Sequence, residues 1–342
     1  MEYPGVDGKI MSKMSVIIAA YHGEKYIGEQ LKSLFKQTRV PDEILIGDDS
    51  SDNKTFLAVE AVRSHYTGEL KYFRNTPRLG VVQNFVHLAK AATGDFIFFC
   101  DQDDVWLPEK IEKLAAILEQ DSTCQVAVCN SAMVDAVLNP LHETILDWIS
   151  DFHKKVEQIN HGKGFFPLLN QTIGFYGHNM AIKHSFLNIL ITIPFAYRTH
   201  DLWIGHSSGF LGVLRYLDEV LTLYRVHVNN TSSPCVQALK KNLLHRFREI
   251  WATSDDVFYI AGLLKSFVQF SENYPDNPNR PLLIAYSRYF SWRADLLKLK
   301  YFQRMLKILQ QPGRLLDHFR YGFGMRSLVR DLIVRPDIPQ KQ

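Results

Sequence analysis

Three aspartates crowd into residues 101–106, Asp-Gln-Asp-Asp-Val-Trp. They follow the apolar run 95–100, Asp-Phe-Ile-Phe-Phe-Cys, which has the short, continuous pattern of a buried parallel strand. Carboxylates at a strand end repel one another and lose water, so the arrangement requires a bound cation. A hard divalent metal suits oxygen ligands and commonly carries phosphates. Because ligands of open α/β sheets bind at strand ends, the sequence predicts a metal–diphosphate site here.

Strand and helix patterns alternate in the part of the chain that must position these acids. Expected strands lie at 15–20, 43–47, 70–73, 95–100 and 124–135, and expected helices at 25–37, 54–66, 84–92 and 108–120. This alternation is typical of right-handed βαβ units. The sequence therefore predicts an α/β fold with a mostly parallel sheet flanked by helices.

The pattern changes further along the chain. Residues 141–170 are expected to form a helical or loop segment over the site, and a helix at 201–209 is expected between strands at 175–182 and 212–226. After about residue 235 the pattern is helical, aromatic and basic. We therefore expect a leader at 1–13, an α/β catalytic domain at 14–235 and a helical C-terminal extension at 236–342.

The formal net charge of +3 conceals an asymmetry, because residues 240–342 hold 18 Lys/Arg against 9 Asp/Glu and the remainder holds 21 against 27. The four cysteines have no zinc or redox spacing, which favours a reducing compartment. No signal peptide and no apolar run long enough to span a membrane is visible. We expect a cytoplasmic protein, or one peripheral on the cytoplasmic face of the inner membrane. No nucleic-acid reading module accompanies the basic charge, so no nucleic-acid partner is expected.

Six motifs, in order, resemble those of glycosyltransferase family 2. They are 16–21 (Val-Ile-Ile-Ala-Ala-Tyr), 48–52 (Asp-Asp-Ser-Ser-Asp), 101–104 (Asp-Gln-Asp-Asp), 177–181 (Gly-His-Asn-Met-Ala), 199–203 (Thr-His-Asp-Leu-Trp) and 224–230 (Tyr-Arg-Val-His-Val-Asn-Asn). The resemblance covers about residues 14–232. Residues 99–106 with His200 and Asp201 resemble the rhamnosyltransferase-like branch that builds bacterial surface polysaccharides.

The resemblance implies a GT-A (Rossmann-like) fold, a nucleotide-sugar donor, a divalent metal (Mn²⁺ or Mg²⁺) and inversion at the anomeric carbon. A UDP- or dTDP-sugar is the expected donor. Asp103 is implied as the direct metal ligand, Asp101 as a neighbour of the ribose or the metal, and His227 as a further ligand. For Asp104, a capping or sugar-contacting role and metal contact stay equally open.

The resemblance also implies contacts with the donor. Asp48 or Asp49 would accept hydrogen bonds from the base or ribose, with an Asx-turn as the alternative. Tyr21, after Ala20, would stack on the base, and Arg78 would approach the base or the diphosphate; a structural tyrosine and a solvated arginine are the alternatives. Four further residues complete the expected donor site: Gln102, His178, Asn179 and Arg225. His178 and Asn179 would line the donor-sugar pocket, with packing at a strand end equally open, and Arg225 would either contact the diphosphate or order its loop.

Asp201 is implied as the catalytic base, or alternatively as a helix N-cap. The family usually has an acid before it, whereas this chain has His200, which would tune the Asp201 pKa or contact the acceptor. Ser50 stands where the family commonly has Gly, which indicates a turn without positive φ. The Gln-x-x-Arg-Trp signature of processive members is absent, so we expect the addition of a single sugar.

The expected acceptor is a glycan or a lipid-linked sugar. Residues 296–309 are amphipathic, basic and aromatic, which indicates either docking on an anionic membrane or helices packed on the catalytic domain. Two other functions would require different residues. A sugar nucleotidyltransferase would need a Gly-rich loop with Arg and Lys where this chain has Ala20–Lys25, and a non-catalytic relative would be expected to lack Asp103 or Asp201.

Overall fold

The structure is a computed structural model of the chain, and it describes residues 12–144, 152–163, 165, 169, 176–227, 254–322 and 325–333. The chain divides into two compact units. Unit 1 comprises Met1–Ile193 and Tyr197–Thr231, and unit 2 comprises Pro194–Ala196 and Ser232–Gln342. The leader expected at 1–13 lies outside the described residues except for Ser12 and Lys13.

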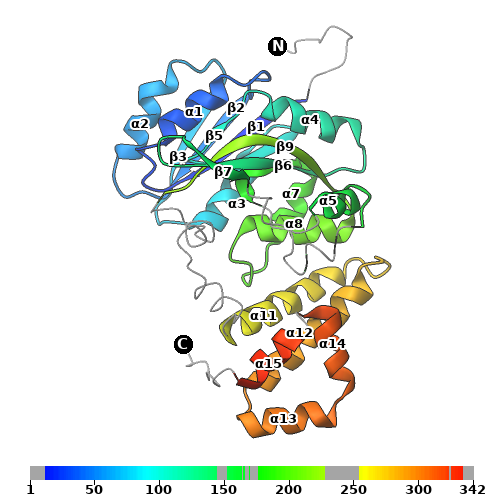
Figure 1. Ribbon diagram of the computed structural model, residues 1–342. Coiled ribbons are helices and arrows are strands. Elements are labelled where there is room, and N and C mark those ends of the chain that lie inside the picture. The colour runs from blue at the N-terminus through cyan, green and yellow to red at the C-terminus, as the bar shows by residue number, and fades with distance from the viewer. Residues whose placement is uncertain are drawn as a thin grey trace. The chain divides into compact units, whose positions relative to one another are not determined.

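The described part of unit 1 contains one mixed sheet with the order β3-β2-β1-β4-β8-β6-β9-β5, and β7 pairs with β6 (Figure 1). The strands are β1 (Met14–Ala20), β2 (Glu43–Asp48), β3 (Glu69–Arg74), β4 (Phe96–Asp101), β5 (Val105–Trp106), β6 (Val126–Val134), β7 (Pro140–Thr144), β8 (Met180–Lys183) and β9 (Leu214–Arg225). The expected parallel order holds over β3-β2-β1-β4. Beyond β4, β8 is antiparallel to both neighbours, while β6 and β9 are parallel.

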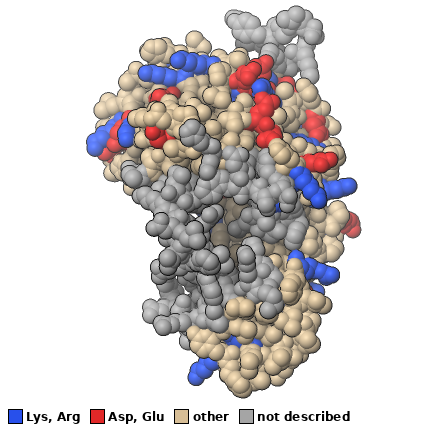
Figure 2. Space-filling model, in the orientation of Figure 1, with Lys and Arg blue, Asp and Glu red and all other residues tan. Residues whose placement is uncertain are grey.

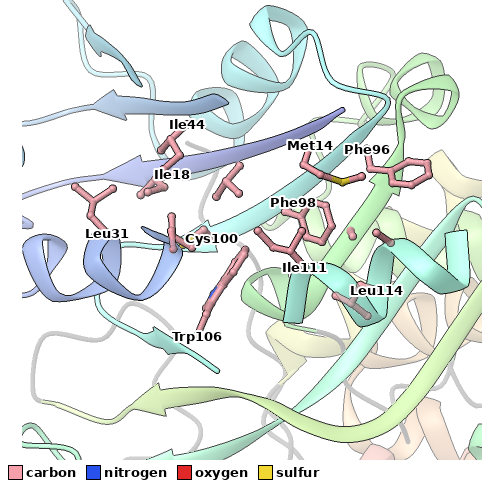
Figure 3. Packing of buried hydrophobic residues seen from close by; sticks show 14 of the residues in the cluster. Met14, Ile18, Leu31, Ile44, Phe96, Phe98, Cys100, Trp106, Ile111 and Leu114 are labelled. Carbon is pink, nitrogen blue, oxygen red and sulfur yellow. The ribbon is translucent and has the colours of Figure 1, made fainter. Parts of the chain in front are cut away.

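Helices cover both faces of this sheet (Figure 1). They are α1 (Ile27–Phe35), α2 (Lys54–Arg63), α3 (Val81–Ala91), α4 (Lys110–Gln120), α5 (Phe152–Asn160), α7 (Leu187–Leu190) and α8 (His200–Leu211), with short 3₁₀ turns at Gly177–Asn179 and His184–Phe186. Alternate strand residues face opposite layers. Ile18 and Phe98 share a buried cluster with Ile111 of α4 (Figure 3), whereas Phe99 packs on Phe85 of α3.

Two expected strands are shorter in the structure. The strand expected at 212–226 begins at Leu214, because Gly212 ends α8 in the left-handed conformation with φ 72°. The strand expected at 175–182 is only Met180–Lys183, because Gly177–Asn179 coil into a 3₁₀ turn. The segment 141–170 is expected to be helix or loop. Its described residues include most of strand β7, which differs from this expectation, and all of helix α5.

The described part of unit 2 is helical: α11 (Ser254–Ser271), α12 (Arg280–Leu297), α13 (Tyr301–Gln310), α14 (Gly313–Tyr321) and α15 (Met325–Ile333). Residues 296–309 are divided between two helices, because Lys300 is extended. Arg293 of α12 forms a buried two-pronged ion pair with Asp331 of α15, with N–O distances of 2.6 and 2.7 Å. Among the described helices of both units, none has the length and apolar character of a membrane span.

Because Gly47 has no side chain, α3 packs close to β2 at the residue that precedes the candidate site in the sequence. Asn84 of α3 donates from Nδ2 to the Gly47 carbonyl at 2.7 Å, and a Cβ at position 47 would lie 2.0 Å from Asn84 Oδ1. By contrast, a Cβ at Gly28 of α1 would make only ordinary contacts at 3.8 Å.

We predict that Gly47→Ala lowers the free energy of unfolding by about 2–3 kcal/mol, because Asn84 must move and loses its hydrogen bond. The matched change Gly28→Ala should leave it unchanged or raise it by up to about 1 kcal/mol. Urea titration measures both, and Gly47→Ala combined with Asn84→Ala should recover part of the loss. Equal stabilities for the two single variants would contradict this packing.

Candidate active site

Parallel pairing brings the C-terminal residues of three strands to one edge of the sheet. β1 lies between β2 and β4, and its register pairs Ala20 with Asp48 and Ala19 with Asp101. The N–H of Asp49 then donates to the Ala20 carbonyl at 2.9 Å. The structure therefore brings four expected site residues together, while their roles toward a donor stay predictions.

The carboxylates of Asp48 and Asp49 hold the loops of this edge in place. Asp48 is fully buried and accepts hydrogen bonds from Ser50 N at 2.9 Å, Ser50 Oγ at 2.5 Å and the Tyr72 hydroxyl. Ser50 does not adopt a positive φ. Asp48 thus forms the Asx-type turn that was the alternative to donor binding.

Asp49 secures the following loop. Its Oδ1 accepts from Asn75 Nδ2 at 2.9 Å and from Leu79 N at 3.1 Å, and its Oδ2 accepts from Gly80 N at 2.8 Å. These bonds hold the backbone directly after Arg78 and the Asn75 side chain before it.

Arg78 and Tyr21 form an exposed aromatic–cation pair at the same edge. The Arg78 guanidinium lies 3.8 Å from the centre of the Tyr21 ring, and Tyr21 keeps 42% of its surface exposed. Gln102 holds the Tyr21 backbone from both sides, accepting from its N–H at 2.9 Å and donating to its carbonyl at 3.1 Å. A flat ring and a planar cation are thus presented to solvent beside the carboxylates, as recognition of a base or a phosphate requires.

Asp103 lies beside His227, the residue that the resemblance implies as a further ligand of the same metal. Asp103 Oδ2 lies 2.9 Å from His227 Nε2, although the two residues are 124 positions apart in the chain. Both side chains are mostly buried, with 16% and 11% exposure. The pair joins the turn after β4 to the segment after β9.

Arg225, at the end of β9, anchors that turn. Its backbone N–H donates to Asp104 Oδ1 at 3.0 Å, and its Nε donates to the Asp103 carbonyl at 2.7 Å. The same guanidinium donates to the Ala136 carbonyl at 2.7 Å and to Glu29 Oε2 at 2.6 Å. Arg225 is 1% exposed. In this arrangement its contacts are with the protein, which matches the loop-ordering alternative to its expected donor contact.

A second polar cluster lies behind the turn and consists of Asp101, Asp104 and His178. His178 Nδ1 lies 3.6 Å from Asp101 Oδ2 and 3.7 Å from Asp104 Oδ2. The imidazole stacks on Tyr224 at 4.9 Å between ring centres, and its Nε2 lies 3.3 Å from Ser131 Oγ. Among the described residues, these three side chains form the one group of three or more potential metal ligands whose ligand atoms lie close enough together to hold a single ion.

Burial and charge affect the two carboxylates of this cluster differently. Desolvation is the main effect that raises the pKa of Asp104 to about 7, and the negative charges of Asp103 and Asp101 raise it further. The charge of His178 lowers this pKa but does not cancel the increase. Desolvation also acts on Asp101, but the hydrogen bond and charge of His178, together with smaller contributions from His200 and Lys110, lower its pKa. Asp101 is therefore ionised at neutral pH, whereas Asp104 titrates there.

Two cluster partners link the site to the core. Asn179 Nδ2 donates to Ser131 Oγ at 3.1 Å, so this expected sugar-pocket residue is 3% exposed and bound inward. The fully buried Lys110 donates to the His178 carbonyl at 2.5 Å and to Thr222 Oγ1 at 2.7 Å. Sequence reasoning missed Lys110. The signal was available, because Lys110 has i, i+4, i+8 spacing with Leu114 and Leu118 on the buried face of α4.

Asp201 lies in the first turn of α8, next to the 3₁₀ turn that carries His178. Its Oδ2 accepts from Gly177 N at 3.2 Å and its Oδ1 from Leu202 N at 2.7 Å. The His200 ring points the other way, stacked on Phe99 with 5.1 Å between ring centres and 5% exposed. Burial lowers the His200 pKa. His200 is thus a neutral core side chain in this structure, and it is not presented to an acceptor.

A GT-A type fold is shared with solved glycosyltransferases. TarS 1–349 from S. aureus, solved with UDP-GlcNAc, aligns with a TM-score of 0.54 at 16% identity over 89% of this chain and 80% of that one. The mannosyltransferase PcManGT from Pyrobaculum calidifontis, solved with GDP-Man and Mn²⁺, aligns with a TM-score of 0.51 at 16% identity over 94% and 79%. At such identities the likeness concerns the fold alone.

Sequence relatives match over shorter stretches. The putative glycosyltransferase EpsE of Bacillus subtilis (strain 168) is 31% identical over 114 residues, which are 33% of this chain and 41% of EpsE. The dTDP-rhamnosyl transferase RfbG of Shigella flexneri is 35% identical over 99 residues, 28% of this chain and 34% of RfbG. The chain therefore spans less than half the length of either relative.

The family assignment comes from a longer match. The model of the family described as glycosyl transferase family 2 matches residues 15–190, which include β1, β2 and β4 with the carboxylates at their ends. Because this match covers just over half of the chain, the protein belongs to glycosyl transferase family 2.

Proposed function

We propose that the chain transfers one sugar, such as rhamnose, from a UDP- or dTDP-sugar to a hydroxyl of a glycan or lipid-linked acceptor, with inversion, during synthesis of bacterial surface polysaccharide (O-antigen or capsule). Family membership and the similarity to RfbG support the reaction class and the sugar. The proposal locates this activity in the cytoplasm, at the face of the inner membrane.

The observation that carries the proposal is the contact between Asp103 and His227. It places one carboxylate and one imidazole at the strand edge where Tyr21 and Arg78 are presented to solvent. The Asp101 carboxylate faces His178 instead. These ligand types fit Mn²⁺ or Mg²⁺, with a substrate diphosphate completing the coordination. When bound, the metal would neutralise the diphosphate leaving group.

The buried cluster offers a different set of ligands for the same ion. Asp104 Oδ2 has no hydrogen-bond partner within the described residues, which fits a bound cation or a proton there. We favour the proton, because Asp104 is fully buried and its raised pKa favours the neutral acid, whereas Asp103 retains some exposure to an incoming diphosphate. On this proposal Asp104 and His178 shape the site from behind.

Asp201 is proposed as the base that removes the acceptor proton. An inverting single displacement requires one such carboxylate and no covalent nucleophile. Its two local N–H donors fix the orientation of the carboxylate without placing a cation on it.

We predict that Asp103→Asn and His227→Gln each lower Mn²⁺-dependent donor hydrolysis by about 10²-fold or more, because the leaving group loses its neutralising ion. Asp104→Asn, which mimics the neutral acid, should keep the Mn²⁺ concentration for half-maximal rate within a few-fold of wild type. Hydrolysis is measured against Mn²⁺ concentration, after a thermal-shift screen of nucleotide sugars. Loss of Mn²⁺ dependence in Asp104→Asn but not in Asp103→Asn would show that the metal binds at the buried cluster instead.

Arg225→Met should lower the free energy of unfolding by about 3 kcal/mol, because it deprives Glu29 and two carbonyls of their donor. We also expect the half-maximal Mn²⁺ concentration to rise about tenfold, since Asp103 and His227 lose their common anchor. The control is Arg215→Met on the same strand, which breaks a partly buried pair with Asp121 at 2.7 Å and bonds to two carbonyls and to Thr123 Oγ1, and should cost about 2 kcal/mol. Its Mn²⁺ dependence should stay at the wild-type value, and equal Mn²⁺ dependence in both variants would refute the anchoring role.

Asp201→Asn should lower the rate of donor hydrolysis by about 10²–10⁴-fold while the thermal shift produced by donor and Mn²⁺ persists. The loss reflects a missing base, and the retained shift shows that donor binding survives. Asp121→Asn is the control, because Asp121 also accepts local N–H bonds, from Thr123 and Cys124. A rate for Asp201→Asn within tenfold of this control would exclude Asp201 as the base.

A further inference from the structure

Helix α13 of unit 2 exposes its apolar side chains. Phe302, Met305, Leu306 and Leu309 have i, i+3, i+4, i+7 spacing, which places them on one face of the helix. Their exposed fractions are 66%, 44%, 40% and 67%. These four residues are called the α13 stripe below. An apolar face of this kind on a surface helix normally packs toward a core, so its exposure indicates an external partner.

The opposite face of α13 explains why the stripe points outward. Arg304 is fully buried and donates to the carbonyls of Leu297, Leu299 and Asp331, at 2.7, 2.8 and 2.9 Å. Ile308, one turn further on, packs in the small core of unit 2. Arg304 therefore satisfies carbonyls at the end of α12, and this fixes the rotation of α13 about its axis. Rotating the stripe inward would leave those carbonyls without a donor.

The charge around the stripe is positive. Residues 298–333 contain eight Lys/Arg and two Asp/Glu. Both acids are already paired: Asp331 is fully buried against Arg293, and Asp317 lies 3.0 Å from Arg314. Asp295, just before this range, pairs with Lys298 at 2.9 Å. Near α13, at the lower end of the view, the charged atoms visible in Figure 2 are blue. The stripe is thus accompanied by cations, and the acids that could neutralise them are engaged.

The neighbouring helix has the same character. Leu316 and Phe319 of α14 are 72% and 60% exposed, and Arg320 follows them. A second copy of this chain would bring the net positive charge of this region against itself, whereas an anionic surface would complement it. At ten residues, α13 is too short to cross a bilayer, but it has the composition of a helix that lies in the lipid interface.

We propose that the α13 stripe docks unit 2 on an anionic phospholipid surface. The four apolar side chains enter the boundary between headgroups and acyl chains. Lys307 lies about 150° around the helix from the middle of the stripe, so it and the N-cap residue Lys300 attract the anionic lipids at longer range rather than by direct contact. This inference supplies a surface and a lipid class for the membrane location proposed above. It is independent of the catalytic residues, because each of its groups belongs to unit 2.

The test is co-sedimentation of the full chain with vesicles of phosphatidylcholine alone and of phosphatidylcholine with phosphatidylglycerol. We expect binding to the anionic vesicles only. Phe302→Ser with Leu309→Ser should lower the partition coefficient at least about tenfold. Lys300→Gln with Lys307→Gln should lower it by about tenfold at low salt and much less at ~1 M NaCl, where charges are screened.

The matched control is Leu57→Ser with Val137→Ser, two apolar residues of unit 1 that are 63% and 74% exposed. This control and the Phe302/Leu309 variant should both hydrolyse donor at the wild-type rate in vesicle-free solution, which separates this inference from the proposed reaction. Equal binding to neutral vesicles, or equal loss in the control, would overturn it. So would an oligomer that fails to bind vesicles and dissociates when the stripe is changed, since a second copy would then be the partner.

Discussion

Negative charge at the end of β4 is the constraint on which the site depends. Asp101, Asp103 and Asp104 lie within four consecutive positions, and the protein must compensate for their charge before any ligand arrives. It does so from distant parts of the chain, because His178 lies beside Asp101 and Asp104, and His227 beside Asp103. Each carboxylate therefore fixes a second segment of unit 1 against the strand edge.

The compensation is unequal, and the difference is chemically useful. Asp104 is enclosed, receives one backbone N–H, and has a raised pKa, so it is only partly ionised at neutral pH. Asp101 retains its ionised form through His178. Full neutralisation by arginines would have left no net charge for a metal to recognise. A partly compensated cluster keeps the turn folded and still attracts a dication.

The sequence predicts the features that are local. Strand alternation predicts β1, β2 and β4, and motif spacing predicts that Asp48 and Asp101 stand at strand ends, because a parallel βαβ order leaves little freedom. Their strands are not neighbours, since β1 lies between β2 and β4. The partners of these acids are not local. Lys110 reaches the His178 carbonyl across 68 positions and Arg225 reaches Asp104 across 121, and no periodicity encodes such pairs. The length of β8 is not predicted for a related reason. Gly177 packs against the His200 ring, and the backbone at Gly177–Asn179 forms a 3₁₀ turn where a strand is expected.

Gln102 continues the sheet after its strands have ended. Its amide meets both the N–H and the carbonyl of Tyr21, as a residue on an adjoining strand would. The loops that follow β1 and β4 are thereby joined by one additional rung made from a side chain. The motions of these two loops are therefore coupled, so a molecule that stacks on the ring of Tyr21 also restrains the acidic loop after β4.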